Sequence, residues 1–493
     1  MVKEFKPTLE QQAIFDWVLS GKGNHLQVGS CAGSGKTTAL EKIARLLPFV
    51  RGLYLVFNKK NEIEAKTKMP RNFEVRTTHG WAYKTIKVEL WEPKKIKGKV
   101  DGCKVGKILH ELLTEQCQGF YYLEEFKDMK KWLPDAVRKT VGLLKNRLEY
   151  PNKETIENIV DSYSILVERD GYNHFLKLTE LTFNQSAEDI ETIDFDDMLF
   201  FPHHYELQPE KVEFVLSDEI QDFNKAQIEL LLKTIGNKSV GVGDRNQSCY
   251  VFRGAMLDAM DKYAEALECE KLLLSVSFRV PKVGKEFVNK TFPHIAFSVP
   301  EWAKEGKITE SSVDLLVQDV KDGDMVICRT NAPLIAPVFE CLRNGKKAFI
   351  VGGDIGKGLK KLIEDNRNGN LENTLRQVGD IISARIADLE RKKKELSAAT
   401  WQDKLDTIVY LAEDCKTVDS MLDRIDLIFT DELQGIAFSS IHRAKGLEAE
   451  NVFLLQPALI PHPKAKSATE KTQEKNIHYV GVTRFKNTLT MVH

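Results

Sequence analysis

The sequence has no long apolar run. No stretch approaches the roughly 20 residues that a membrane-spanning helix needs. The first residues, MVKEFKPTLE, are charged and lack the apolar core of a signal peptide. These absences exclude membrane-embedded and secreted classes. We therefore expect an intracellular, cytoplasmic protein without a membrane partner, associated with the nucleoid if its source is bacterial or phage.

Closely spaced cysteine pairs are also absent. The 8 cysteines are scattered along the chain, and no CxxC pair occurs among them. Zinc ribbons and iron–sulfur clusters are usually built on such pairs, so both are disfavoured. The pattern fits a reducing compartment.

The chain has no excess of charge of either sign. Its 71 Lys and Arg residues nearly balance its 72 Asp and Glu residues, which gives a formal net charge of −1. A nucleic-acid groove would therefore have to be a local basic patch on a neutral body. Because 493 residues are too many for one hydrophobic core, we expect about two to four domains.

Apolar strands and amphipathic helices alternate along much of the chain. Short apolar segments predict strands at residues 25–29, 53–57, 212–216, 239–242, 325–328, 348–351, 436–440 and 452–455. The segments at about 84–191 and 359–431 have helical character and little strand signal. This pattern predicts an α/β fold with two parallel-sheet cores, each interrupted by a helical insertion.

The segment Ser30-Cys-Ala-Gly-Ser-Gly-Lys-Thr37 lies between the first predicted strand and the first long helix. Its glycines let backbone N–H groups turn toward an anion, and the helix N-terminus adds the positive end of its dipole. Lys36 would reach the β- and γ-phosphates of ATP, and the Thr37 hydroxyl would ligate Mg²⁺. Ser30 stands where the strict P-loop pattern has glycine. The alternative is a flexible Gly/Ser turn.

A later segment, Val215-Leu-Ser-Asp-Glu-Ile-Gln-Asp222, ends an apolar strand in two carboxylates. Asp218 would lie at the carboxyl edge of a parallel sheet, where a Mg²⁺-bound water needs an acidic partner. Glu219 would orient and deprotonate the attacking water. In isolation a solvated acidic turn would be favoured, but the P-loop upstream favours the phosphate site.

Together with Val242-Gly-Asp-Arg-Asn-Gln-Ser-Cys-Tyr-Val-Phe-Arg-Gly-Ala255, this acidic segment resembles motifs II and III of the superfamily 1 DNA helicases of the UvrD/Rep type. Further motifs of that family are matched in order at residues 10–11, 54–59, 77–83, 193–198, 277–279, 328–331, 440–448 and 479–484. The segments FNK (57–59) and TTHGWAY (77–83) are most similar to the F-box DNA helicase branch, although no F-box region is expected here. The resemblance covers nearly the whole chain.

The resemblance implies two RecA-like P-loop motor domains. Motor domain 1A would comprise residues 1–84 and 192–280, with helical insertion 1B at 85–191. Motor domain 2A would comprise residues 281–358 and 432–493, with helical insertion 2B at 359–431.

The resemblance also implies a set of nucleotide contacts. Those around the phosphates and Mg²⁺ are Gly33, Ser34, Gly35, Lys36, Thr37, Thr38 and Asp218. Gln11 would bond to the adenine edge, Phe278 would stack on the base, and Glu448 would contact the ribose. Gln247 would sense the γ-phosphate, and Arg279 and Arg484 would reach that phosphate from the opposing domain. Taken singly, each could instead be an ordinary polar, core or surface residue.

For DNA, the resemblance implies base stacking by aromatic side chains and backbone contacts by polar ones. The candidates are Phe57, Asn58, Thr78, His79, Tyr250, Phe252, Ser440 and His442, followed by Trp81 and Tyr83. Stacking is worth roughly 1–3 kcal/mol per base, so an aromatic shelf can compete for a base at a duplex junction. Phe57 could equally belong to a strand core, and the lysines at 94–99 are better explained as a solvated loop.

The function that the resemblance implies is an ATP-dependent DNA helicase or translocase. It would be an ATPase stimulated by single-stranded DNA, with 3′–5′ polarity, acting at single-strand/duplex junctions in DNA repair, recombination or replication. Two alternatives stay open. One is a translocase that strips proteins from DNA with little unwinding, and the other is a P-loop ATPase switch that recruits a nuclease or another protein partner.

Overall fold

The computed structural model describes residues 6–21, 23–115, 124–163, 165, 167–168, 171–249, 254–430 and 434–493. The chain forms two compact units. The first unit contains residues 1–30 and 35–274, and the second contains residues 31–34 and 275–493. The finer division into motor domains 1A and 2A and insertions 1B and 2B stays a prediction.

The first unit is built on a six-stranded sheet with the strand order β3-β2-β6-β7-β1-β8. Its strands are β1 (His25–Ser30), β2 (Gly52–Val56), β3 (Phe73–Thr77), β6 (Val212–Ser217), β7 (Ile235–Gly243) and β8 (Glu270–Leu274). All neighbouring strands run parallel. The carboxyl ends of β1 and β6 therefore lie at the same edge of the sheet, and the P-loop and the acidic segment leave the sheet there.

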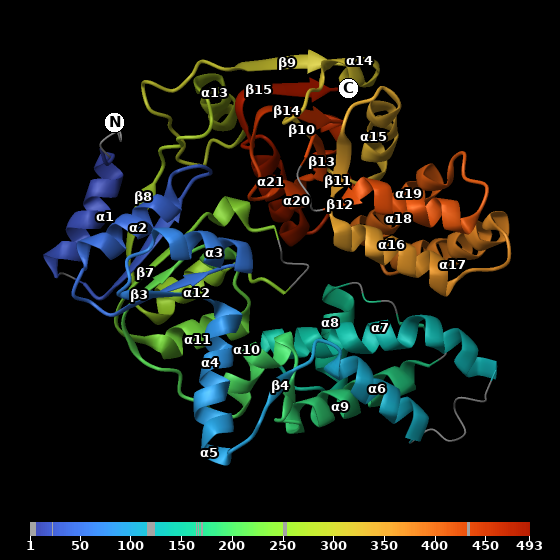
Figure 1. Ribbon diagram of the computed structural model, residues 1–493, viewed down its shortest axis with the longest axis horizontal. Helices are drawn as coiled ribbons and strands as arrows, with labels where there is room; N and C mark the ends of the chain where they lie inside the picture. The colour runs from blue at the N-terminus through green and yellow to red at the C-terminus, as the bar shows by residue number, and fades with distance from the viewer. Residues whose placement is uncertain are drawn as a thin grey trace. The chain divides into compact units, whose positions relative to one another are not determined.

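Helices cover both faces of this sheet (Figure 1). They are α1 (Leu9–Ser20), α2 (Lys36–Leu46), α3 (Lys59–Lys68), α4 (Thr78–Ile86), α10 (Phe195–His204), α11 (Lys225–Thr234) and α12 (Ala259–Ala266). Side chains alternate along β2 between the two faces. Tyr54 and Val56 belong to the core formed with α1, α2 and α3, whereas Leu53 and Leu55 belong to the core formed with α4, α10, α11 and α12. A strand buried on both faces needs a continuous apolar run.

A largely helical insertion lies between α4 and α10. It contains a π-helical turn (Lys87–Trp91), α5 (Glu92–Lys94), β4 (Lys99–Val100), α6 (Lys104–Glu115), α7 (Glu124–Arg147), α8 (Lys153–Ser162), α9 (Tyr172–Glu188) and β5 (Thr192–Ile193). Figure 1 shows α6 to α9 gathered into one group. Their buried apolar residues share a core with α4, α10 and α11, so the insertion packs firmly on the sheet unit.

Buried charges also hold the insertion in place. Asp197 of α10 lies between two lysines, with Lys145 Nζ 2.6 Å from its Oδ1 and Lys104 Nζ 2.9 Å from its Oδ2. Lys145 and Asp197 are fully buried. Because an unpaired buried charge is very costly, these ion pairs fix α6 and α7 of the insertion against α10.

The second unit has a seven-stranded parallel sheet with the order β12-β11-β13-β10-β14-β15-β9. Its strands are β9 (Lys307–Ser311), β10 (Met325–Cys328), β11 (Ala348–Val351), β12 (Phe429–Thr430), β13 (Ile436–Ser440), β14 (Ala449–Leu455) and β15 (Phe485–Val492). The two parallel sheets with their helices confirm the predicted α/β class and its two sheet cores.

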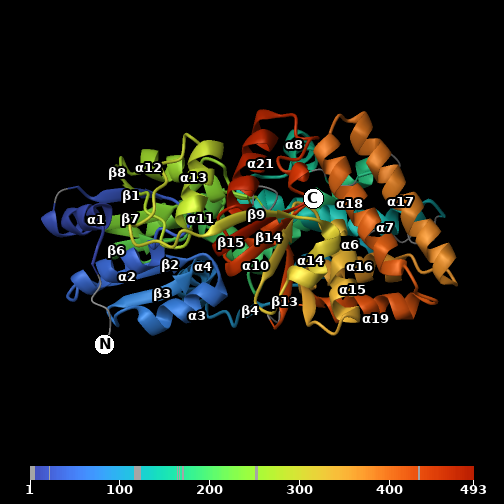
Figure 2. The same ribbon diagram turned by 90° about the horizontal axis from the view of Figure 1, so that it is seen from above.

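The helices of the second unit are α13 (Lys282–Thr291), α14 (Val313–Asp319), α15 (Ala332–Arg343), α16 (Gly353–Asp365), α17 (Leu371–Arg391), α18 (Glu395–Ala412), α19 (Val418–Ile428), α20 (Ile441–Ala444) and α21 (Ala468–Gly481). Helices α16 to α19 follow one another between β11 and β12 and lie together (Figure 2). Ile382 of α17 and Ile408 of α18 join the core of the sheet. Within the described ranges, no helix combines the length and the apolar character that spanning a membrane would require.

Candidate functional site

The loop between β1 and α2 has the conformation that phosphate binding needs. Gly33 and Gly35 have φ angles of 73° and 75°, in the left-handed region that glycine enters without steric cost. The Ser34 hydroxyl is buried and has no hydrogen-bond partner among the residues that the structure describes. Ser30, which replaces the usual glycine, donates its hydroxyl to the Gly243 carbonyl at 2.8 Å and so ties the end of β1 to β7.

Lys36 and Glu219 form an ion pair at the carboxyl edge of the sheet, with 2.9 Å between Nζ and Oε1. Glu219 has a φ of 55°. This conformation is uncommon for a residue with a side chain, and such strain concentrates at functional sites. Burial alone would lower the pKa of Lys36, but the charges of Glu219, Asp218 and Asp244 raise it, so the ammonium group stays charged.

Asp218 accepts hydrogen bonds at both carboxylate oxygens. The Thr37 hydroxyl donates to Oδ2 at 3.2 Å, and the Tyr54 hydroxyl donates to the same oxygen at 3.1 Å. The backbone N–H of Glu219 donates to Oδ1 at 2.9 Å. Burial, and then the charge of Glu219, raise the pKa of Asp218 to about 6 against the opposing effect of Lys36. Burial and the Asp218 charge also raise the pKa of Tyr54 well above its usual range, so its hydroxyl remains a donor.

These side chains suit a divalent cation. The Thr37 hydroxyl and the Asp218 carboxylate are oxygen ligands of the kind that Mg²⁺ prefers. The carboxylates of Asp218, Glu219 and Asp244 all act on the single ammonium group of Lys36. A local excess of negative charge therefore remains, which a magnesium ion beside a phosphate would offset. The donor set fits the predicted Mg²⁺ site.

Gln221 joins the acidic segment to the segment that follows β7. Its Oε1 accepts the backbone N–H of Asp244 at 3.0 Å, and its Nε2 donates to Glu219 Oε2. Gln247 in turn donates to Asp244 Oδ2 at 2.6 Å. The predicted γ-phosphate sensor is thus connected to the predicted catalytic base. The sequence patterns gave no role to Gln221, Asp244 or Tyr54. All three lie inside matched motifs, and this position was the one sequence feature that could have marked them as site residues.

Gln11 lies in the first turn of α1 and is buried. Its backbone N–H donates to the Thr8 hydroxyl at 3.2 Å, and its Oε1 accepts the backbone N–H of Thr8 at 3.1 Å. This capping box stabilises the start of the helix. The adenine contact of Gln11 stays a prediction beside that structural role.

In the second unit, the structure brings Arg279 and Glu448 together as an ion pair between Nε and Oε2. Lys486 Nζ lies 2.7 Å from the other oxygen of Glu448. Burial alone would raise the pKa of Glu448, but the charges of Arg279 and Lys486 lower it. Phe278 is 41% exposed and stacks on Trp302, with 6.3 Å between the ring centroids. Phe278 is therefore not an ordinary core aromatic.

Arg484, also in the second unit, is 1% exposed. Its Nε donates to the Val480 carbonyl at 2.9 Å, and its Nη2 donates to the Thr483 hydroxyl at 3.0 Å. Its guanidinium group therefore helps to hold the end of α21 as well as being a predicted phosphate contact. Because it is buried, Arg484 is not an ordinary surface residue.

The predicted DNA contacts of the first unit differ in accessibility. Phe57 lies just beyond β2 and is partly exposed, so it is not strand core, and the exposed Asn58 caps α3 through its side chain. Thr78 is fully buried, and its hydroxyl accepts a hydrogen bond from Gln227 at 2.8 Å. Trp81 is 1% exposed and belongs to the core, so it cannot offer a face to a base.

The remaining DNA candidates lie in other segments. His79 is partly buried in α4, and burial lowers its pKa. Ser440 ends β13 and is buried, whereas His442 of α20 is partly exposed. Tyr250 and Phe252 lie outside the described residues. DNA binding by this set stays a prediction.

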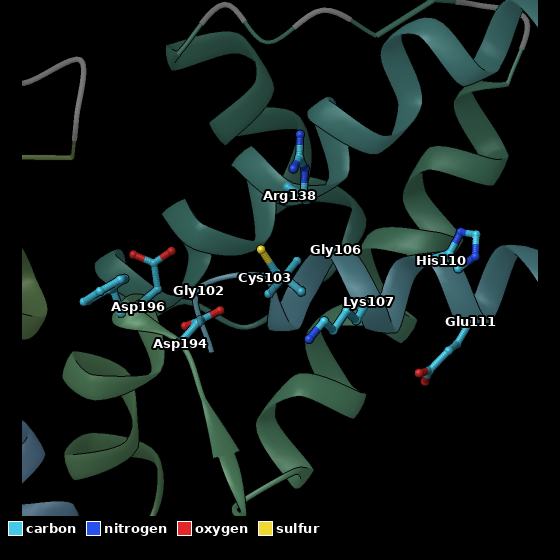
Figure 3. Close-up of a pocket in the computed structure, with 11 residues that line it drawn as sticks. Gly102, Cys103, Gly106, Lys107, His110, Glu111, Arg138, Asp194 and Asp196 are labelled. Atoms are coloured by element: carbon cyan, nitrogen blue, oxygen red, sulfur yellow. The ribbon is translucent and has the colours of Figure 1, made fainter. Parts of the chain in front are cut away.

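A separate pocket of about 540 Å³ opens within the first unit, beside the start of α6 and the start of α10 (Figure 3). Lys107 and Arg138 line it, together with the carboxylates of Asp194 and Asp196. Lys107 is paired with Asp101, and Arg138 is paired with its helix neighbour Asp135. This mixed and paired charge does not indicate a phosphate site, and none of the predicted site residues lines the pocket.

Two helicase family descriptions match the sequence of the chain. The family of the UvrD/REP helicase N-terminal domain matches residues 11–268, and the family of the UvrD-like helicase C-terminal domain matches residues 343–493. The chain is 23% identical to F-box DNA helicase protein 1 of Schizosaccharomyces pombe, over 98% of this chain and 57% of that protein. It is 22% identical to F-box DNA helicase 1 of Gallus gallus, over 99% of this chain and 49% of that protein.

A shorter match, 32% identical, links 26% of the chain to 17% of the ATP-dependent DNA helicase PcrA of Bacillus subtilis. The chain spans about half the length of the F-box relatives. The two domain matches are consistent with two RecA-like motor domains and confirm the resemblance seen in the motifs. Since the N-terminal match alone covers more than half of the 493 residues, the chain belongs to the UvrD/REP helicase family.

Proposed function

We propose that the chain is an ATP-driven motor on DNA. It would be an ATPase stimulated by single-stranded DNA that moves 3′ to 5′ and separates strands at single-strand/duplex junctions in repair, recombination or replication. The observation that carries this proposal is the convergence of Lys36, Thr37, Asp218 and Glu219 at one sheet edge. The names of the similar proteins, all DNA helicases, support DNA as the track.

ATP hydrolysis would use the ion pair at the centre of the site. Lys36 would turn from Glu219 to the β- and γ-phosphates, and the backbone N–H groups at residues 33–38 would surround them. Glu219, released from the ammonium group, would take a proton from the attacking water. Thr37 and Asp218 would hold Mg²⁺, which when bound neutralises charge on the phosphates.

Gln247 would report the γ-phosphate to the base through Asp244 and Gln221. Gln247 already bonds to the Asp244 carboxylate, the Asp244 backbone N–H bonds to Gln221, and Gln221 bonds to Glu219. Arg279 and Arg484 remain the proposed arginine contacts to that phosphate. Arg279 would exchange Glu448 for phosphate, which would leave Glu448 available for the ribose. Phe278 and Gln11 are the proposed base contacts.

Single-stranded DNA would be held by Phe57, Asn58, Thr78, His79, Tyr250, Phe252, Ser440 and His442. Stacking on the aromatic members supplies affinity without sequence preference. The hydroxyl of Thr78 is engaged by Gln227, so a DNA contact by Thr78 would use its backbone. Such a motor would act inside the cell, where its DNA lies.

The test is ATP hydrolysis with and without single-stranded DNA at low salt, with Glu219→Gln as the inactive control. Stimulation by DNA is expected, whereas none would favour an ATPase switch that recruits a protein partner. Strand separation on duplexes with a 3′ or a 5′ tail then tests polarity. Preference for the 3′ tail is expected. Equal inactivity on both duplexes, despite DNA stimulation, would favour a translocase that strips proteins from DNA.

A further inference from the structure

One buried hydroxyl group in the nucleotide site belongs to a residue without an assigned role. Tyr54 lies in the middle of β2 and is 1% exposed. Its hydroxyl donates to Asp218 Oδ2 at 3.1 Å. β2 pairs directly with β6, with Tyr54 opposite Leu216, two residues before Asp218. The sheet register thus brings the tyrosine to the carboxylate.

Packing alone explains the ring of Tyr54 but not its hydroxyl. The ring belongs to the core that includes Val56, Leu216 and Leu40, and a phenylalanine would fill the same space. A buried phenol needs a hydrogen-bond partner. Here the partner is an ionisable carboxylate at the edge of the phosphate site, and a hydrogen bond to a charged group is roughly twice as strong as a neutral one.

Three donors restrain the Asp218 carboxylate from different elements. Tyr54 of β2 and Thr37 of α2 donate to Oδ2, and the Glu219 backbone N–H donates to Oδ1. A carboxylate offers about four lone-pair sites. Three are taken by these donors, so about one remains for a metal or a metal-bound water. Removing the tyrosine hydroxyl would let the carboxylate rotate or accept a water in its place.

We propose that Tyr54 is a positioning residue for magnesium, and that its hydroxyl holds Asp218 in the orientation in which that carboxylate serves the ion. The inference rests on the proposed ATPase function. Partners of metal ligands in other proteins typically contribute 10- to 100-fold to metal affinity. Tyr54→Phe should therefore raise the Mg²⁺ concentration needed for tight nucleotide binding by roughly 10- to 100-fold.

The experiment measures binding of a fluorescent, non-hydrolysable ATP analogue to the full chain, first in EDTA and then across a Mg²⁺ titration. Tyr54→Phe should match the unmodified chain in EDTA and need more Mg²⁺ to reach full affinity. Tyr263→Phe is the matched control. Tyr263 is also fully buried in this unit, but its hydroxyl bonds to Ser239 at 2.8 Å, so the Mg²⁺ midpoint should not change.

An unchanged Mg²⁺ midpoint in Tyr54→Phe would overturn the proposal, and so would an equal loss of affinity in EDTA and in Mg²⁺. A double-mutant cycle removes any effect of altered folding. In an Asp218→Asn background, Tyr54→Phe should add no further shift, and a full additional shift would contradict positioning through Asp218. If the proposed ATPase function is wrong, the unmodified chain itself would not bind the analogue. Both proposals would then fall.

Discussion

Lys36 and Glu219 contact each other directly, with the ammonium nitrogen 2.9 Å from a carboxylate oxygen. The group proposed to hold the phosphates is thus paired with the group proposed to activate water. We infer that arrival of a triphosphate exchanges the partner of Lys36 and releases Glu219 at the same moment. The base would then become available only when there is a phosphate to attack.

Lys36→Ala should abolish productive nucleotide binding or turnover. The change removes the cation that faces the phosphates and leaves Asp218 and Glu219 without their shared counter-charge. Nucleotide affinity and kcat of the purified chain measure the effect. Lys60→Ala, on the exposed side of α3, serves as the control and should behave as the unmodified chain. A near-normal kcat in Lys36→Ala would contradict the phosphate assignment.

Glu219→Gln should bind ATP and hydrolyse it at least ~10²-fold more slowly, which is the usual size of a lost general base. Glutamine keeps the shape of the side chain and can still accept from Gln221, but it cannot take a proton. Single-turnover hydrolysis together with nucleotide binding separates the two steps. If turnover stayed within a few fold of normal, another group would have to be the base.

Arg484→Ala should slow ATP turnover while leaving the affinity for single-stranded DNA unchanged in the absence of nucleotide. Because the guanidinium group also bonds to the end of α21, the thermal midpoint should fall as well. Arg484→Lys separates the two effects, since it keeps the charge but loses the planar fork. Loss of DNA binding alone would mean that the arginine serves a different ligand.

Lys145→Met should destabilise the first unit by about 3–5 kcal/mol, the usual cost of breaking a buried ion pair. The substitution leaves the fully buried Asp197 with Lys104 as its remaining close cation. Thermal or urea unfolding measures this loss in the free energy of unfolding. Lys139→Met is the matched control on the same helix, because Lys139 is 61% exposed and its pair with Asp135 is worth little. Equal losses in the two variants would show that the buried cluster is not an anchor.

Asp196→Asn should remove the part of the pH dependence of stability that comes from titration of the Asp196 carboxyl group. Burial, then the charge of Asp194, raise the pKa of Asp196 from 3.8 to about 6. The stability contributed by this group is therefore fully present below pH 3.8 and is lost as the pH rises through about 6. Asparagine can still accept from Asn146, which donates to Asp196 Oδ1 at 2.7 Å.

Across that pH window, the stability of Asp196→Asn relative to the unmodified chain should rise by up to about 3 kcal/mol. Thermal midpoints of both proteins at about pH 4, 5 and 7 test this expectation. Asp135→Asn, at a half-exposed position of α7, is the control and should give no such rise. If the thermal midpoints of Asp196→Asn and of the unmodified chain changed in parallel with pH, the pKa of Asp196 would not be raised in the folded protein.

The strands that could be predicted are those buried on both faces. Residues 325–328 and 348–351 are apolar throughout and became β10 and β11 with the expected bounds. The strands β3, β8 and β9 were not among the predicted strands. They lie at sheet edges, where charged residues are tolerated, so charges shorten or interrupt the apolar run in FEVRT, EKLLL and KITES.

The sequence by itself determined the local features of the site. These are the glycines at 33 and 35 that allow a left-handed loop, the apolar strand that ends in Asp218 and Glu219, and the ordered family motifs. Only the tertiary structure decided which polar groups meet. Tyr54 and Asp218 are 164 residues apart and touch because β2 and β6 are neighbours in register. Side-chain periodicity fixes which face a residue takes, but contacts between distant segments depend on strand order, which no local pattern encodes.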